Sequence, residues 1–183
     1  MKRRITPIAS LALIILIGLL LPASVLATAK TSYLQNTKKV YVYRVDQDDK
    51  KTVTMTYTGK AKQKELKGYN VWNVEYKLGA DGNGKGGYWE KETLKGLYNT
   101  DGLVVSYPVK KNKKWKNAWS SLTIKSTNKT IKVPAGTFKN VVEVKVDDGE
   151  DVYYRYYAKN VGFVLGVVDG ERSTELLKLK NKK

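Results

Sequence analysis

Residues 69–78 read YNVWNVEYKL, and apolar and polar side chains alternate along this stretch. In an extended chain one face would carry the large apolar side chains, namely Trp72, Val74, Tyr76 and Leu78. A period of two with one apolar face is typical of an antiparallel sheet that packs on one side. The stretch therefore predicts a strand whose tryptophan and tyrosine face an interior.

The same alternation recurs in residues 51–59, 140–146 and 152–159, and helical periodicity is almost absent after residue 30. In VYYRYYAK (152–159) we expect Tyr154 and Tyr156 on the apolar face and Arg155 on the opposite face. The pairs Asp101-Gly102 and Asp169-Gly170 are typical of tight hairpin turns. Without an amphipathic helix to cover it, a flat sheet would expose its apolar face. We therefore predict an all-β fold: a single highly curved antiparallel sheet or open barrel (half-barrel), with mostly meander connections.

Residues 131–140, IKVPAGTFKN, contain a Pro-Ala-Gly triplet between two β-branched runs. The residue before a proline favours an extended backbone, so Val133 can end a strand. Pro134 and Gly136 suit the second and fourth positions of a type I turn. We expect a corner here, with antiparallel strands on either side of it.

The first residues combine a basic start, an apolar run over 8–21 and small residues around Ala27. This layout predicts a signal peptide over 1–29 and a single β domain over 30–183. The alternative is a membrane anchor, but the run falls short of the roughly 20 residues that span a bilayer. The predicted localisation is secreted or associated with the cell surface after cleavage of the signal peptide.

The chain lacks cysteine and histidine. Their absence removes disulfides, histidine-based catalysis and the usual zinc or copper ligands, and we expect no catalytic, cofactor or metal site. The net charge is +17, almost entirely from lysine. Specific recognition of nucleic acid favours arginine, so a lysine-rich surface instead suggests diffuse attraction to an anionic cell-wall polymer or an acidic lipid surface.

Three segments in order, YPVKKNKKW (107–115), VPAGTFKNVVEV (133–144) and YYAKNVGFV (156–164), resemble a bacterial secreted domain of unknown function that occurs alone or in cell-surface proteins. The resemblance covers residues 107–179. It implies a curved antiparallel sheet comparable in shape to half-barrel lipoprotein carriers, and it carries over no catalytic residues. Asn112 stands where that family usually has glycine, and asparagine is the next best residue for positive φ.

The densest basic cluster is KKNKKWK (110–116). Its lysines are candidate polyanion contacts: Lys110, Lys111, Lys113, Lys114 and Lys116. Trp115, within the cluster, is expected to pack in the core. The aromatic side chains are candidates for lining a cavity that holds a small apolar ligand, namely Trp72, Tyr76, Tyr154 and Tyr156, although plain core packing explains them as well.

Two acidic patterns allow other functions. Residues 81–92, DGNGKGGYWEKE, match a calcium loop in spacing, but Lys85 occupies a ligand position, so a glycine-rich hairpin loop is the better prediction. Glu90 and Glu92 share a strand face and would loosely suit a glycosidase pair. We expect Trp89 to face inward and both glutamates to face solvent. The resulting expectation is an exported, non-catalytic domain that binds at the cell envelope; the alternatives are a half-barrel carrier of an apolar or lipid ligand and a carboxylate-based secreted hydrolase.

Overall fold

The computed structural model describes residues 31–182, which belong to one compact unit of twelve strands and two single-turn 3₁₀ helices. The strands are β1 (Lys39–Val45), β2 (Asp48–Lys60), β3 (Asn70–Lys77), β4 (Asn83–Thr93), β5 (Gly96–Asn99), β6 (Gly102–Ser106), β7 (Lys114–Lys116), β8 (Ser121–Val133), β9 (Gly136–Asp147), β10 (Val152–Ala158), β11 (Gly162–Val168) and β12 (Glu171–Asn181). The 3₁₀ helices are η1 (Lys64–Leu66) and η2 (Gly79–Asp81). No helix in this described part is long and apolar enough to cross a membrane. The predicted signal peptide lies outside the described residues.

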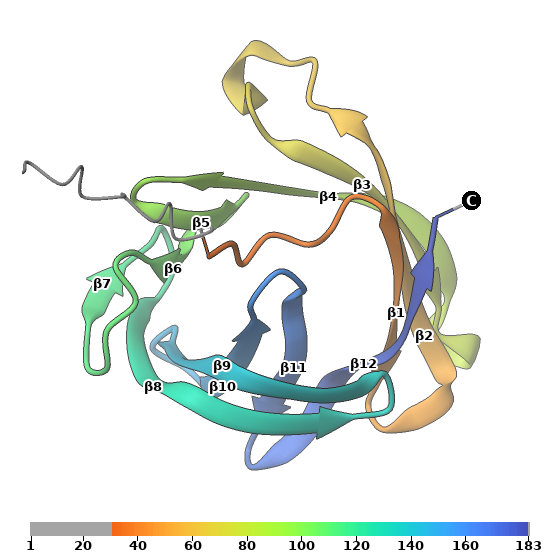
Figure 1. The fold of residues 1–183 in the computed structure, drawn as a ribbon. Coiled ribbons are helices and arrows are strands. Elements are labelled where there is room, and N and C mark those ends of the chain that lie inside the picture. The colour runs from red at the N-terminus through yellow and green to blue at the C-terminus, as the bar shows by residue number, and fades with distance from the viewer. Residues whose placement is uncertain (1–30, 183) are drawn as a thin grey trace, which may run out of the picture. The chain divides into compact units, whose positions relative to one another are not determined.

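All twelve strands form one antiparallel sheet in the order β6-β5-β4-β3-β2-β1-β12-β11-β10-β9-β8-β7. Strands adjacent in sequence are adjacent in the sheet, except that β1 also pairs with β12 and β6 does not pair with β7. The sheet curls until its two edges approach each other, which gives a nearly closed barrel with an unsealed seam (Figure 1). The predicted all-β, curved antiparallel architecture with meander connections is confirmed.

The seam between β6 and β7 has no strand ladder; one backbone hydrogen bond, from Ala118 N to Asp101 O at 3.5 Å, and several side chains join its two sides. The Trp115 indole Nε1 donates a hydrogen bond to the Leu103 carbonyl oxygen at 2.9 Å. Apolar side chains from both sides of the seam form one buried cluster: Leu97, Val104 and Val105 from β5 and β6, with Leu122, Ile124, Val142, Val144 and Val146 from β8 and β9. The half-buried ring of Trp115 packs against this cluster, as the sequence predicted.

The turns largely follow the sequence signals. Val133 pairs with Gly136, so Pro134 and Ala135 form the predicted corner between antiparallel β8 and β9. Asp169 and Gly170 have φ of 51° and 81° in the predicted tight turn between β11 and β12. The β5–β6 turn differs by one residue: Asn99 pairs with Gly102, so its central residues are Thr100 and Asp101, and Gly102 starts β6.

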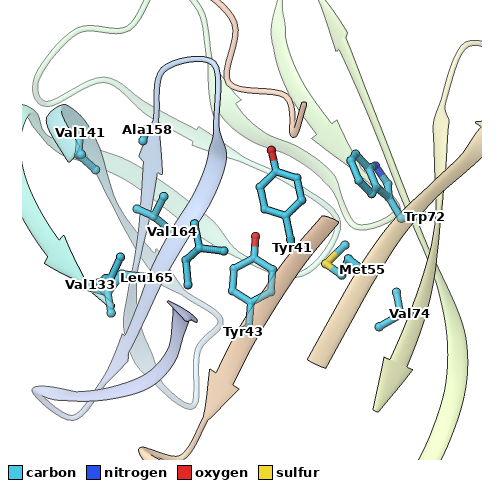
Figure 2. Close-up of a cluster of buried hydrophobic side chains, with 11 residues drawn as sticks. Tyr41, Tyr43, Met55, Trp72, Val74, Val133, Val141, Ala158, Val164 and Leu165 are labelled. Carbon is cyan, nitrogen blue, oxygen red and sulfur yellow. The ribbon is translucent and has the colours of Figure 1, made fainter. Parts of the chain in front are cut away.

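A second buried cluster lies inside the barrel beside β1. Figure 2 shows Tyr41 and Tyr43 of β1 between Met55, Trp72 and Val74 on one side and the side chains of β8–β11 on the other. The two tyrosine rings stack with centroids 6.3 Å apart. The half of the β8–β9 hairpin nearest its turn lies beyond the part of β9 that pairs with β10. The turn itself reaches β12, where Ala135 N donates a hydrogen bond to Leu176 O at 3.1 Å.

The segment 31–38, which precedes β1, crosses one end of the barrel (Figure 1). Tyr33 and Gln35 are buried there, at 3% and 4% exposure. Asn160, in the β10–β11 turn, donates to the Ser32 carbonyl at 2.7 Å. Tyr41 also connects the segment to the β10–β11 turn, because its hydroxyl accepts a hydrogen bond from Asn36 N at 2.6 Å and donates one to Val161 O at 2.8 Å. The segment closes this end of the interior.

Candidate ligand-binding cavity

A cavity of about 530 Å³ lies inside the barrel. Its wall comes from β1–β4, the end of β5 with the β5–β6 turn, and β10–β12. Seven aromatic side chains line it: Tyr43, Tyr76, Tyr88, Tyr153, Tyr154, Tyr157 and Phe163. Aliphatic side chains and Met55 supply most of the remaining apolar wall. Its size lies within the range of about 300–1,000 Å³ that is usual for small-molecule sites.

Glycine at two strand positions makes room for side chains that line the cavity. Gly86 of β4 pairs with Val74, and a Cβ atom there would lie 3.3 Å from Cε2 of Tyr76. Gly166 of β11 lines the cavity, and a Cβ atom there would lie 3.2 Å from the Ser173 Oγ. Larger residues would therefore push against neighbouring side chains at both positions.

The two ends of the cavity differ. Gln35 of the segment 31–38 lines the closed end, and its side-chain Nε2 donates to the Tyr43 hydroxyl at 3.0 Å. At the opposite end the lining includes Thr100, Asp101 and Val168, which lie in or beside the hairpin turns of that end. Val168 is 36% exposed, so the cavity reaches the surface there.

Arg155 of β10 places a positive charge in the cavity wall. Its Nη2 lies 3.5 Å from the Tyr153 hydroxyl, and its guanidinium carbon lies 5.2 Å from the centre of the Tyr153 ring. Burial raises the pKa of the Tyr88 and Tyr157 phenols, and the nearby Arg155 charge offsets this effect only in part. Both phenols therefore stay protonated at neutral pH and can donate hydrogen bonds.

The four predicted cavity residues have different positions. Tyr76 and Tyr154 belong to the lining. Trp72 is fully buried, packs edge-on against Tyr41 with ring centres 5.6 Å apart, and does not line the cavity. Tyr156 is also absent from the lining, and its hydroxyl donates a hydrogen bond to the Glu143 Oε1 at 2.8 Å.

The prediction that Arg155 faces away from the interior is wrong. Arg155 lines the cavity together with Tyr153 and Tyr157, its neighbours two positions away. The alternation in β10 does not identify the inward face, because both faces of the strand carry tyrosine and both are at least half-buried over 153–157. A bulge relative to β11 between Tyr156 and Tyr157 also breaks the regular register.

The prediction for Glu90, Glu92 and Trp89 is wrong as well. Glu90 is 2% exposed and accepts a hydrogen bond from Gln35 N at 3.0 Å, while Glu92 accepts one from Tyr33 N at 2.9 Å and another from the Tyr107 hydroxyl. Trp89 lies on the other face of β4, half-buried over Gly87. The backbone donors that hold the two carboxylates come from the segment 31–38, more than fifty residues away, so no local pattern could reveal them.

Burial raises the pKa of the Glu90 carboxyl to about 8. The Gln35 backbone N–H and the Trp72 indole act in the opposite direction because they favour the charged carboxylate. The indole N–H nevertheless completes no hydrogen bond within residues 31–182. Neither Glu90 nor Glu92 lines the cavity. Their contacts fasten the segment 31–38 to the barrel wall.

The lysine cluster lies at the β6–β7 connection and on β7. Lys110, Lys111, Lys114 and Lys116 are exposed, whereas Lys113 is half-buried and its Nζ donates to the Tyr107 carbonyl. Asn112 has the positive φ that the sequence predicted, at 65°. Trp119, just beyond β7, is 75% exposed.

The prediction of a glycine-rich hairpin loop over residues 81–92 is wrong for most of the stretch. Residues 83–93 form strand β4, so this stretch is neither a calcium loop nor mainly a hairpin loop. Among residues 31–182, no three His, Cys, Asp or Glu side chains come together as a possible metal site. The actual hairpin turn precedes the strand, at η2. Gly84, Gly86 and Tyr88 alternate along β4, and the ladder places Gly84 opposite Tyr76 of β3.

No family model, curated protein or solved structure matches this chain. Its function has to be inferred from the cavity and the surfaces themselves.

Proposed function

We propose that this domain binds a small, largely apolar molecule inside its barrel. The observation that carries the proposal is the cavity of about 530 Å³ lined by seven aromatic side chains. An apolar molecule that enters such a cavity leaves water and gains contact with the rings, and both effects favour binding. A protein that only needed stability would gain from filling this space, since cavities in a core are destabilising.

The proposed role is carriage or capture of the ligand, without catalysis. The two interior carboxylates that resemble a catalytic pair, Glu90 and Glu92, are occupied by hydrogen bonds from Gln35 and Tyr33. Neither carboxylate lines the cavity, so neither is placed to act on a molecule bound there. We further propose that the domain works outside the cytoplasm, as the sequence of residues 1–29 predicts.

A cavity-filling substitution tests the proposal. Val53 of β2 lines the cavity, whereas Thr54, the next residue along the strand, does not. We expect Val53→Trp to weaken binding of the neutral fluorescent probe N-phenyl-1-naphthylamine by roughly tenfold or more. The larger side chain would occupy part of the space that the probe needs, and a loss of about 1.4 kcal/mol in binding free energy lowers the affinity tenfold. Thr54→Trp, the matched control on the opposite face, should bind the probe as the parent does.

Thermal unfolding of both variants would confirm that each is folded. Mass spectrometry of protein purified under native conditions would then identify any molecule that accompanies the parent and is lost from the Val53→Trp variant. Absence of probe binding to the parent, or equal binding by all three proteins, would contradict a ligand in the barrel.

A second candidate function is adsorption to an anionic surface. The observation that favours it is the exposure of four lysines of the cluster together with Trp119, which is 75% exposed. Lysine attracts acidic polymers and lipid headgroups, and an exposed tryptophan is well suited to the interfacial region of a bilayer. The two functions are compatible, because the cluster and the cavity occupy different parts of the domain.

A further inference from the structure

Arg155 is a cation without an acidic partner in a largely aromatic and apolar wall. It forms no ion pair within residues 31–182. The other two arginines of the described part, Arg44 and Arg172, both pair with Glu175. A charge removed from water without a partner is costly, so an unpaired arginine in a cavity calls for a functional explanation.

The groups around Arg155 do not neutralise it. The Tyr153 hydroxyl lies 3.5 Å away, and the Tyr153 ring offers only a cation–π contact at 5.2 Å. The one acidic residue of the lining, Asp101, accepts a hydrogen bond from the Asn99 Nδ2 at 3.0 Å and forms no ion pair with Arg155. Glu90 is hydrogen-bonded to Gln35 N and lies outside the lining.

The strand next to Arg155 leaves room for a ligand. Arg155 pairs across the β10–β11 ladder with Gly166, which has no side chain to extend over the guanidinium group. Both residues line the cavity. The protonated phenols of Tyr88 and Tyr157 line the same space and add hydrogen-bond donors. A guanidinium group beside neutral phenols forms a site that donates hydrogen bonds and carries positive charge.

We propose that the ligand of this cavity is an amphipathic anion, whose carboxylate or phosphate group pairs with Arg155 while its apolar body lies against the aromatic lining. This inference rests on the proposed function and narrows its ligand class. The planar guanidinium fork can donate two parallel hydrogen bonds to either oxyanion. A neutral ligand would leave the arginine unpaired, and a cationic ligand would be repelled.

The test uses four ligands with the same twelve-carbon chain: dodecanoate, dodecyl phosphate, dodecanol and dodecylamine. Each is titrated below its micelle concentration against the parent protein loaded with neutral N-phenyl-1-naphthylamine, at pH 8 and fixed salt. We expect at least one of the two anions to bind roughly tenfold to a hundredfold tighter than dodecanol, the gain typical of a charge-assisted hydrogen bond, with dodecylamine weakest. Comparison of the two anions decides between carboxylate and phosphate.

Substitutions assign the preference to Arg155. Arg155→Gln should lose most of the preference for the anion over dodecanol, whereas Arg155→Lys should keep part of it. Lys125→Gln, at an exposed position on β8, makes the same change in charge and should keep all of it. Arg155→Gln removes an unpaired charge, so we expect it to fold, and its near-ultraviolet circular dichroism should match that of the parent.

The possible failures are distinguishable. If the neutral probe and dodecanol bind but neither anion binds more tightly than dodecanol, the anionic ligand class is wrong and the proposed function stands. If Arg155→Gln retains the preference, Arg155 is not the anion-binding residue and the inference is overturned. If neither the probe nor any of the four ligands binds the parent, both the inference and the proposed function are wrong.

Discussion

The carboxyl group of Glu90 is buried at the closed end of the barrel, and its protonation is linked to folding. Its ordinary pKa of 4.5 is raised to about 8 in the folded protein, mainly by burial. Between these two values the folded state retains a proton that the unfolded state has lost. The stabilising contribution of Glu90 is therefore fully present below pH 4.5, declines as pH rises, and is lost above pH 8.

Replacement of Glu90 by glutamine should remove this dependence. The glutamine side-chain oxygen can still accept the Gln35 N–H, but it carries no charge at any pH. We expect Glu90→Gln to match the parent near pH 4.5 and to exceed it at pH 8 by several kcal/mol, on the order of 3–5, in the free energy of unfolding. Urea denaturation at both pH values measures the difference.

Glu171→Gln provides the control, because Glu171 is exposed at the start of β12. It should change stability little at either pH. A Glu90→Gln variant that is no more stable than the parent at pH 8 would show that the buried carboxyl is stabilised as an anion by its donors, in contradiction to the direction of the pKa shift.

At the scale of single elements, the seam between β6 and β7 depends on Trp115. Its ring covers the apolar cluster that joins the two edges, and its indole N–H supplies a hydrogen bond across the seam to Leu103 O. We expect Trp115→Ala to lower the free energy of unfolding by about 3 kcal/mol, at the lower end of the range for buried aromatics because the ring is only half-buried. Trp115→Phe, which keeps a ring and loses the N–H, should cost about 1 kcal/mol.

Chemical denaturation of the two variants measures both effects, and Trp119→Ala is the control. Trp119 is 75% exposed, so its removal should change stability by no more than about 0.5 kcal/mol. If Trp115→Ala unfolds at the same denaturant concentration as the parent, the seam is closed by the other apolar side chains and Trp115 is dispensable.

Strand formation and the corners between strands were predictable because their causes are local. Alternation predicted β3, and the proline before a small residue and glycine predicted the turn between Val133 and Gly136. Asn112 adopts positive φ for the same local reason, since asparagine tolerates that conformation.

The faces of β4 and β10 were not predictable, because alternation identifies an interior only when the opposite face meets water. The sequence alone predicts a solvent-facing Glu90, whereas in the structure its carboxylate accepts a hydrogen bond from the backbone of Gln35. The sequence alone predicts an exposed Arg155, whereas in the curved sheet its side chain lines the cavity. The curvature and the enclosing segment are properties of the assembled barrel, so a strand considered alone contains no signal for them.

At the scale of the whole molecule, the cavity and the charge distribution suggest two separate modes of interaction. The cavity lies within the barrel, whereas the exposed lysines 110, 111, 114 and 116 lie at the connection from β6 to β7 and on β7. The net charge of +17 adds a positive background to this region. Long-range attraction would bring the domain to an acidic surface without occupying the cavity.

The structure identifies which lysines can take part in such adsorption. Lys113 is engaged with the Tyr107 carbonyl, so it is omitted from the test. Lys111, Lys114 and Lys116 are exposed, and their combined replacement by glutamine should lower binding to vesicles rich in acidic lipid by roughly tenfold or more at low salt, since each lysine near such a surface contributes about 1 kcal/mol. The stability of the domain should be unchanged within about 0.5 kcal/mol per substitution.

The matched control replaces Lys62, Lys64 and Lys67, which are exposed around η1, by glutamine. Both variants lose the same net charge, so a difference between them reports the position of the cluster and not the overall charge. Binding of the parent should also weaken as salt rises beyond about 0.15 M, where the screening length is about 8 Å. Equal losses in the two variants would mean that attraction comes from the total charge alone. Binding that persists in both variants and at high salt would instead point to the exposed Trp119, because apolar insertion is not screened by salt.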